Sequence, residues 1–126
     1  MTREAVATAR APAAVGPYSQ AIKTDGLVFA SGQLGLDPQS GTLRAGLEEQ
    51  TQQALTNLAA VLEAAGTGLQ DVVKTTIFLV DLSQFGVVNR IYATAFNGVP
   101  PARSTVQVAA LPLGGLIEIE AIAVVR

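Results

Sequence analysis

Residues 116–126 read "LIEIEAIAVVR", an alternating run that is typical of a β-strand. Successive side chains of a strand point to opposite faces, so one face carries Ile117 and Ile119 and the other carries Glu118 and Glu120. An ionised glutamate is costly to bury without a partner. The strand therefore offers one apolar face to a core. Its other face holds two carboxylates that need water, a cation or a ligand.

Two helices are predicted elsewhere in the chain. The helix at 47–65 has the clearest pattern, because leucines and other apolar residues recur on one stripe and Gly66 follows as a helix-ending residue. Its remaining surface is expected to be covered by Glu48, Glu49, Gln52, Gln53, Asn57 and Glu63. A second helix is expected to begin after Ser83, which would cap it, and to end before the "NGVPP" stretch at 97–101.

The remaining strands are predicted from runs rich in β-branched and alternating residues. They are expected at 4–8, 18–23, 27–31, 71–80 and 104–110. Asp25-Gly26 predicts a tight hairpin turn, and "LDPQSG" at 36–41 predicts a second turn. The order β-β-β-α-β-α-β-β predicts an α+β fold, a six-stranded mixed sheet with two helices packed on one face. The other face then needs a cover, which in a small chain is often another subunit.

The composition fits one packed domain over residues 1–126, with 49% hydrophobic residues. Ten acidic and eight basic residues leave a net charge of −2, and no run of Lys or Arg is present. We therefore expect neither a nucleic-acid partner nor an anionic membrane partner. No apolar run approaches the roughly 20 residues of a membrane-spanning helix.

The chain contains no Cys and no His. This excludes a disulfide, a thiolate nucleophile, a Ser-His-Asp triad and an imidazole metal ligand, so no metal site is expected. Catalysis has to use carboxylates, hydroxyls, Tyr, Lys, Arg or backbone amides. The lack of Cys fits the cytoplasm, and the charged residues Arg3, Glu4 and Arg10 argue against a signal peptide.

Several residues have side chains that could bind a ligand. Arg103 follows two prolines at the start of a strand, a stiff mount for a guanidinium that binds a planar anion. Its position alone favours the alternative, an Arg that extends into water. Gly32, in "SGQ" at 31–33, allows close approach to the backbone. Tyr18 could donate to a ligand or lie in the core, and Asn89 could lie at an interface or face solvent.

Four stretches together resemble one known family over nearly the whole chain. They are "APAAVGPYSQA" (11–21), "FASGQLGLDPQSG" (29–41), "VVKTTIFLVDL" (72–82) and "PARSTVQVAALPLGGLIEIEAIAV" (101–124). Matched in order and spacing, they are similar to the RidA family, also called YjgF/YER057c/UK114, and most of all to its enamine/imine deaminase subgroup. The resemblance implies a chorismate-mutase-like α+β fold and a homotrimer with ligand clefts between subunits.

The resemblance also implies an activity, cofactor-independent 2-iminobutanoate/2-iminopropanoate deamination. Such enzymes hydrolyse 2-aminoacrylate and related enamine or imine acids, released by pyridoxal-phosphate-dependent dehydratases, to 2-keto acids and ammonia. Arg103 falls on the family's carboxylate-binding Arg and Glu118 on its water-orienting Glu. The substrate-binding positions fall on Gly32 with Ser31, Tyr18, Asn89 and Thr105. Thr105 stands where many members carry Cys, and Pro100 where many carry an aromatic residue.

The residue inventory suits this chemistry, because a protonated imine carbon is electrophilic and water can attack it once the carboxylate is held and the water is placed. Other functions stay open at this point: a non-catalytic module that binds 2-keto acids, an endoribonuclease, or a holdase. The role of Glu120 is also open. It could pair with Lys74 across strands or with a neighbouring subunit. For both Glu118 and Glu120 the alternative is an interface salt bridge in a trimer.

Overall fold

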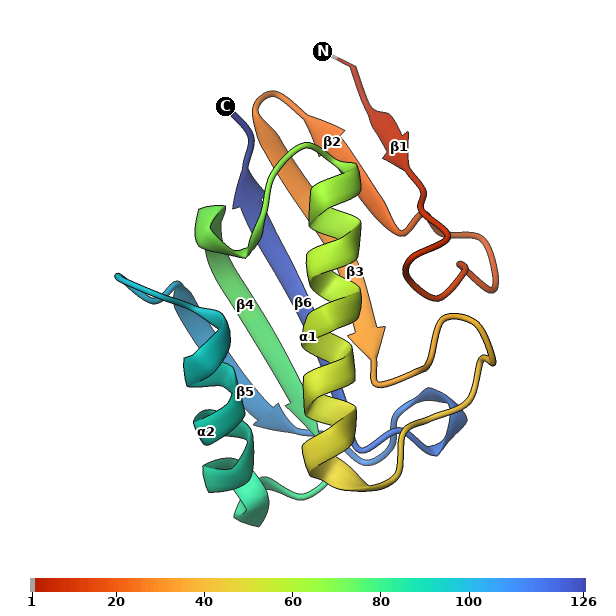
Figure 1. The fold of residues 1–126 in the computed structure, drawn as a ribbon, viewed down its shortest axis with the longest axis vertical. Coiled ribbons are helices and arrows are strands. Elements are labelled where there is room, and N and C mark those ends of the chain that lie inside the picture. Colours follow the sequence, from red (N-terminus) through yellow and green to blue (C-terminus); the bar gives the residue numbers. More distant parts are fainter. Residues whose placement is uncertain (1) are drawn as a thin grey trace.

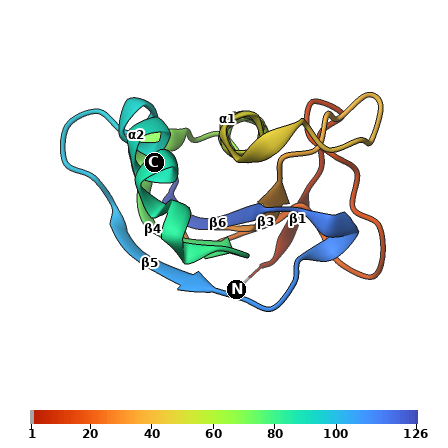
Figure 2. The same ribbon diagram turned by 90° about the horizontal axis from the view of Figure 1, so that it is seen from below.

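The computed structural model describes residues 2–126 as a six-stranded mixed sheet with α1 and α2 on one face (Figures 1 and 2). The strand order is β1-β2-β3-β6-β4-β5, and this is the α+β arrangement that the sequence predicts. The elements are β1 Glu4–Val6, β2 Ala21–Thr24, β3 Leu27–Leu34, α1 Gly46–Ala64, β4 Val72–Leu79, α2 Phe85–Ala95, β5 Ala102–Gln107 and β6 Ile117–Val124. Short 3-10 turns lie at η1 Leu69–Asp71, η2 Leu82–Gln84 and η3 Pro112–Gly114.

The strand β6 lies in the middle of the sheet, antiparallel to β3 on one side and to β4 on the other. Ile117 and Ile119 are fully buried beneath the helices, as their alternation predicts. The pair β4 and β5 is parallel, which makes the sheet mixed. The side chains of Glu118 and Glu120 in β6 therefore lie on the face that the helices do not cover.

The hairpin between β2 and β3 turns at Asp25 and Gly26, whose φ angles of 49° and 77° are those of a tight hairpin turn. The flanking strands differ from their predicted bounds. The strand β2 begins at Ala21 and not at residue 18, because residues 18–20 belong to the preceding loop. The strand β3 continues past residue 31 to Leu34, although its register with β6 shifts between Ala30 and Gln33.

The helix α1 buries its predicted apolar stripe, and Gly66 follows its end with φ of 90°. The prediction for Asn57 is wrong, because this side chain is fully buried and does not cover the solvent side. Its amide donates to the carbonyl oxygens of Leu34 at 3.1 Å and Leu36 at 2.8 Å. Asn57 therefore ties the helix to the end of β3 and to the chain that follows it.

The prediction that Ser83 caps the second helix is also wrong. The residue before α2 is Gln84, which makes no side-chain capping hydrogen bond. Asp81 caps the preceding turn η2, and its carboxylate accepts hydrogen bonds from the Ser83 backbone N–H at 3.0 Å and from the Ser83 hydroxyl at 2.6 Å. These hydrogen bonds lower the pKa of Asp81. The turn η2 comes first and α2 begins only at Phe85, so the start of the helical segment lies two residues earlier than predicted.

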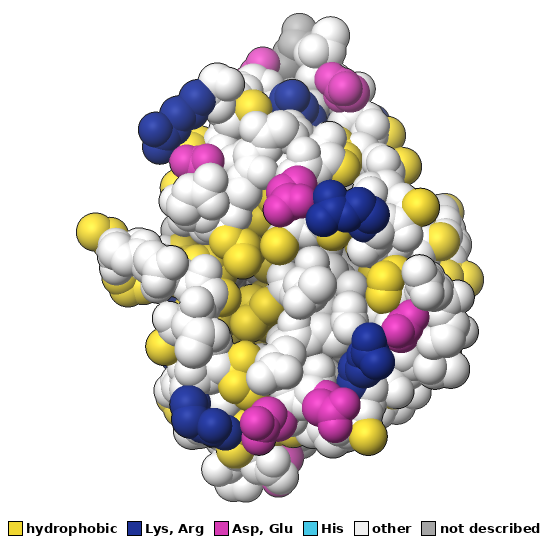
Figure 3. All heavy atoms as spheres, viewed as in Figure 1, with side chains coloured by type: hydrophobic (Ala, Val, Ile, Leu, Met, Phe, Trp, Pro, Cys, Tyr) yellow, Lys and Arg dark blue, Asp and Glu magenta, His cyan; other side chains and the backbone are white. Residues whose placement is uncertain are grey.

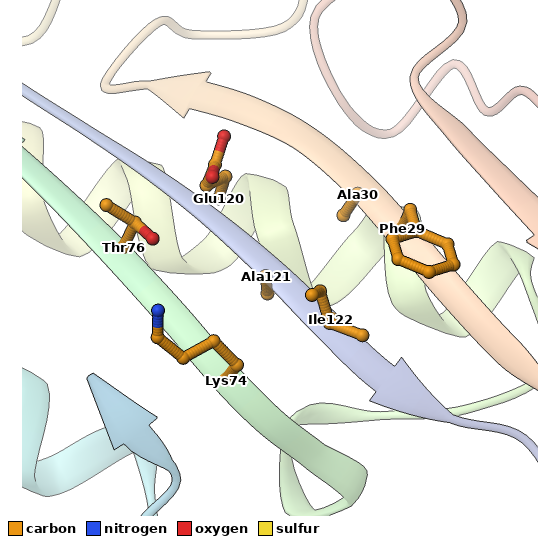
Figure 4. Close-up of a pocket in the computed structure, with 7 residues that line it drawn as sticks. All are labelled: Phe29, Ala30, Lys74, Thr76, Glu120, Ala121 and Ile122. Carbon is orange, nitrogen blue, oxygen red and sulfur yellow. The ribbon is translucent and has the colours of Figure 1, made fainter. Parts of the chain in front are cut away.

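The second face of the sheet carries no helix among residues 2–126 (Figure 2). Phe29, Lys74, Thr76, Glu120 and Ile122 stand on it from three adjacent strands (Figure 4). Phe29 remains 43% exposed there, an unusual fraction for a large apolar side chain in mid-sheet. We call these residues the open face. No helix in residues 2–126 is both long enough and apolar enough to cross a membrane.

Candidate functional site

Glu118 lies in a cleft at the end of the open face, where β6 begins and β3 ends. The cleft has a volume of about 350 Å³ and is lined mainly by apolar side chains. Its walls are Pro12, Ala13, Val15, Tyr18, Gln20, Gly32, Gln33, Leu34, Leu36, Pro112, Leu113 and Glu118. Glu118 is the only ionisable carboxyl among them. A cleft of this kind can hold a small molecule with an apolar part and present one carboxyl group to it.

Gly32 lies directly against the Glu118 side chain. A Cβ atom at residue 32 would lie 2.7 Å from Cδ of Glu118, closer than real contacts allow. Ser31 and Gly32 have no register partner on β6, because the ladder is interrupted between Ala30 and Gln33. The Ser31 hydroxyl instead donates to the carbonyl oxygen of Ser19 at 2.6 Å. The predicted close approach at Gly32 therefore exists in this chain, and the group that approaches is the carboxyl of Glu118.

Tyr18 reaches the same cleft from the loop before β2. Its side chain is 53% exposed, so it is not the core residue that one interpretation of the sequence suggested. The Tyr18 hydroxyl accepts a hydrogen bond from the Val15 N–H at 3.3 Å. The phenol is therefore held by its own loop while it lines the cleft.

The surroundings of Glu118 oppose its ionisation. Burial raises its pKa above the ordinary glutamate value, and the negative charge of Glu120, two residues along the same face, raises it further. Within one chain burial dominates, since Arg103 is not among the groups that shift Glu118.

Arg103 lies elsewhere, on the helix-bearing side of β5. Its guanidinium carbon is 5.2 Å from the ring centre of Phe85 and 4.9 Å from that of Tyr92, so the cation stacks on two aromatic rings of α2. The Tyr92 hydroxyl is fixed in turn by a 2.7 Å hydrogen bond with Thr75. Within residues 2–126, Arg103 has no carboxylate within 4.0 Å. The guanidinium is thus oriented by packing and has no anion partner in its own chain.

Asn89 and Arg103 share a second cleft. It measures about 450 Å³ and is lined by Asn89, Tyr92, Ala93, Phe96, Gly98, Pro100, Pro101 and Arg103. The face of the molecule that bears the helices shows apolar side chains gathered in a hollow between α1 and α2, and the loop at 97–101 stands out beside it (Figure 3). Asn89 Oδ1 is buried and has no hydrogen-bond partner in the described chain.

Thr105, two residues after Arg103, resembles Asn89 in one respect. Its Oγ1 atom is also buried without a hydrogen-bond partner in the described chain. Thr105 is opposite Ile77 and Arg103 is opposite Thr75, and both partners point into the core beneath the helices. Thr105 therefore belongs to the Arg103 side of the sheet.

The predicted site residues thus fall into two groups on opposite faces of one sheet. Glu118, Gly32, Ser31 and Tyr18 surround the first cleft, whereas Arg103, Asn89 and Thr105 lie on the helix side of β5. In strand register Glu118 is opposite Phe78, next to the buried Ile77 and therefore on the other face. A single chain does not bring Arg103 to Glu118, so one copy of the chain cannot present both groups to one small molecule.

Glu120 forms no ion pair with Lys74 within the described chain, since the ion pairs of residues 2–126 involve other residues. Thr76, not Lys74, is directly opposite Glu120 in register. Glu120 is exposed on the open face (Figure 4). The cross-strand interpretation is therefore wrong within one chain, and pairing with a neighbouring subunit stays a prediction. Residues 2–126 also hold no cluster of three His, Cys, Asp or Glu side chains suited to a metal ion.

Sequence reasoning missed the apolar wall of the Glu118 cleft. Pro12, Val15 and Leu113 come from two loops that carry no periodic pattern. Gln20 lies in the "APAAVGPYSQA" stretch at 11–21, but nothing in that stretch indicates that its side chain is almost completely buried. A polar residue directly before an apolar strand was the one available signal.

Known proteins resemble this chain over nearly its full length. Residues 8–125 match the family model described as Endoribonuclease L-PSP. The crystal structure of RidA from the Antarctic bacterium Psychrobacter sp. PAMC 21119 superposes with a TM-score of 0.95 at 48% identity, covering 97% of this chain and 99% of that one. The chain belongs to the RidA family.

Two curated members of the RidA family show how similar the sequences are. The 2-iminobutanoate/2-iminopropanoate deaminase of Mus musculus is 54% identical over 123 residues, which are 97% of this chain and 91% of that protein. The chloroplastic Reactive Intermediate Deaminase A of Arabidopsis thaliana is 56% identical over 122 residues, 96% of this chain and 65% of that protein. The family resemblance drawn from the four sequence stretches is thereby confirmed.

Proposed function

We propose that this chain is a cofactor-independent deaminase that hydrolyses 2-enamine and 2-imine acids, of the 2-aminoacrylate and 2-iminopropionate type, to 2-keto acids and ammonia. The observation that carries the proposal is the half-buried Glu118 in an apolar cleft beside Gly32. About half-identical relatives named 2-iminobutanoate/2-iminopropanoate deaminase support the same reaction.

In the proposed reaction, an enamine acid first takes a proton from solvent at C3 and becomes the imine. Water then adds to the C=N carbon and ammonia leaves. The oxygen of water bonds to C2 while Glu118 accepts a proton from that water. The nitrogen, which gains a proton, then departs with the electrons of the C–N bond, and the remaining hydroxyl loses its proton as the 2-keto group forms. Arg103 holds the substrate carboxylate through two parallel hydrogen bonds. Tyr18, Asn89 and Thr105 complete the binding contacts, and Gly32, next to Ser31, contributes its backbone N–H as a donor.

We propose further that the active site lies between subunits of a homotrimer. The position of Arg103 and Glu118 on opposite faces supports this, because a second copy is needed to supply the missing group. Unpaired polar groups are expected at a site that a second subunit completes. In residues 2–126 the Arg103 guanidinium has no anion partner, and the buried side-chain oxygens of Asn89 and Thr105 have no hydrogen-bond partner. The open face of the sheet supplies apolar surface for subunit contact.

A cytoplasmic location belongs to the same proposal. Enamine and imine acids react with water on their own, so a protein that consumes them has to work where the dehydratases release them. The Cys-free sequence fits a reducing compartment.

The decisive test is Glu118→Gln in a coupled assay, with Glu120→Gln as the matched control. An amino-acid dehydratase generates the imine in the cuvette, and its loss is followed with and without this protein. The Glu118→Gln variant is expected to lose at least about 100-fold in kcat, the scale of general-base catalysis, because an amide cannot accept the water proton. The Glu120→Gln variant is expected to retain turnover, since Glu120 lies outside the cleft.

Other outcomes would identify other functions. If Glu118→Gln changes neither turnover nor 2-keto acid binding while Arg103→Ala abolishes binding, the protein is a binding module. Cleavage of single-stranded RNA by the parent would indicate the ribonuclease in the family's description. The absence of His and of a basic run speaks against that activity.

A further inference from the structure

One wall of the Glu118 cleft is built from irregular backbone. Residues 8–15, here called the strap, include Pro12, Ala13 and Val15 of that wall. The strap lies outside helices and strands. Among the backbone–backbone hydrogen bonds of residues 2–126 outside helices and strands, none involves residues 8–15. Some other group has to hold this wall in place, because backbone polar groups that leave water need partners.

That group is the side-chain amide of Gln20, which is only 5% exposed. Gln20 Oε1 accepts a hydrogen bond from the Thr8 N–H at 2.6 Å. Gln20 Nε2 donates to the carbonyl oxygens of Pro12 at 2.7 Å, Thr8 at 3.1 Å and Ala11 at 3.4 Å. Both ends of the amide are therefore used on the strap, and they join its beginning to its middle.

The base of Gln20 is fixed beside the proposed active site. The Gln20 carbonyl oxygen accepts from the Ser31 N–H at 2.9 Å, and the Ser31 hydroxyl bonds to the neighbouring Ser19 carbonyl at 2.6 Å. Ser31 directly precedes Gly32, which touches Glu118. One side chain thus links the backbone next to the catalytic carboxyl to the opposite wall of the cleft.

Two other tethers exist, and both are exposed. The Val15 N–H donates to the Tyr18 hydroxyl at 3.3 Å. Arg10 Nη1 pairs with Glu63 Oε1 at 3.0 Å, and the two side chains are 70% and 55% exposed. Ion pairs in water contribute little to stability. The buried amide, with four hydrogen bonds to the strap, is therefore the strongest of the three tethers, and the exposed ion pair provides a matched control.

We propose that Gln20 is the positioning residue that holds the strap as the wall receiving the substrate's apolar side chain. The inference rests on the proposed deaminase function. The amide acts through the strap, since its polar atoms contact only residues 8–12. A loosened strap weakens the binding of substrates with long side chains and leaves the chemistry at Glu118 in place.

The test compares Gln20→Glu and Gln20→Met with Glu63→Gln. The Glu variant turns a carboxylate oxygen toward three carbonyl oxygens, and the Met variant keeps the length without hydrogen bonds. Trypsin cleavage after Arg10 under native conditions is expected to be at least about tenfold faster in both Gln20 variants, because it follows the population of the opened strap. Glu63→Gln is expected to stay within about twofold of the parent.

Two further readouts separate positioning from a general loss of structure. With imines generated by an amino-acid oxidase, the Gln20 variants are expected to raise KM more for the leucine-derived imine than for the alanine-derived one, with kcat little changed. In the unmodified protein, the Thr8 amide proton is expected to be protected from hydrogen exchange, since Gln20 Oε1 is its acceptor. Hydrogen exchange at Thr8 tests whether Gln20 holds the strap even if both variants fail to fold.

Unchanged cleavage after Arg10 in variants that fold, or an unprotected Thr8 amide, would overturn the strap assignment. An equal rise in KM for both imines would overturn the role in side-chain binding. If the parent shows no deaminase activity, the proposed function fails, but trypsin and hydrogen exchange still test the strap independently.

Discussion

Glu118 is a carboxyl group that the folded chain keeps partly out of water, next to a second carboxyl. Its pKa is raised by burial and by Glu120. A glutamate with a higher pKa in the folded than in the unfolded state stabilises the fold fully below its unfolded pKa. That contribution is lost as pH rises through the folded pKa. The raised pKa also brings the group closer to the range in which a base works well near neutral pH.

The difference in stability between Glu118→Gln and the parent is expected to vary with pH. Its direction is opposite to that expected when a salt-bridged carboxylate is replaced by an amide. Relative to the parent, the variant gains stability as pH rises from the ordinary glutamate pKa of about 4.3 toward neutrality, because Gln never ionises. Urea midpoints between pH 4 and pH 8 measure this. Both proteins should carry Arg103→Ala, so that a neighbouring guanidinium does not oppose the shift. A difference that does not vary with pH would show that Glu118 is not buried as described.

The family resemblance predicted that Gly32 and Tyr18 belong to the site of Glu118, but the sequence did not predict where Arg103 lies relative to them. Both residues stand in the stretches that carry the resemblance, and they do line the cleft. The face of the sheet on which Arg103 lies depends on the alternation of side chains along β5. That strand begins at Ala102 and not at residue 104 as predicted. A shift of one residue in a strand exchanges the two faces. The separation of Arg103 from Glu118 therefore emerged only from the register of the sheet.

At the scale of elements, α1 supports the cleft through Asn57. The Asn57 amide binds the Leu34 and Leu36 carbonyls, and both of these residues line the Glu118 cleft. Gln53 Nε2 donates to Asn57 Oδ1 at 2.7 Å and fixes the orientation of the amide. The helix is thus joined to the end of β3 by hydrogen bonds as well as by apolar packing.

Asn57→Leu is expected to lower the free energy of unfolding by about 1–3 kcal/mol, because two buried carbonyl groups lose their donor. The control is Thr56→Ala, on the exposed side of the same helix, which should cost no more than about 0.5 kcal/mol. Urea denaturation of both variants measures the difference. Equal midpoints for the two variants would contradict a structural role for the buried amide.

The predicted elements match the structure where periodicity is strong and fail where a polar side chain acts in the core. The sequence predicts β6, β4 and α1 within about two residues, since their apolar faces are continuous. Asn57 was misplaced because a helical stripe drawn from apolar residues assigns every amide to solvent. Ser83 was wrongly expected to cap α2 because the turn η2, which Asp81 caps, precedes the helix, and a cap is recognised only relative to a known helix start.

At the scale of the whole molecule, the open face is the feature that one chain leaves unfinished. Phe29 and Val106 are 43% and 42% exposed there, on opposite sides of the sheet's centre. Sheets that bury one face beneath helices and leave apolar residues on the other are usually completed by a partner. We interpret this face as the contact between subunits of the proposed homotrimer.

Phe29→Glu is expected to dissociate the trimer, because it places a charge at the centre of an apolar contact. Sedimentation velocity at micromolar concentration measures the result. Gln52→Glu adds the same charge on the solvent side of α1 and should leave the assembly unchanged. A parent protein that sediments as a stable monomer would refute the trimer, and a trimeric Phe29→Glu variant would place the contact elsewhere.

The most direct test of a shared active site mixes two inactive proteins. Arg103→Ala keeps Glu118, and Glu118→Gln keeps Arg103, so each homotrimer lacks one group at every site. If each site joins Glu118 of one subunit to Arg103 of the next, random reassembly of equal amounts restores both groups at roughly a quarter of the sites. We predict that the refolded mixture recovers about that share of the parental kcat, whereas the separately refolded variants stay inactive. No recovery in mixed trimers, verified by two different affinity tags, would contradict an active site built from both faces of the sheet.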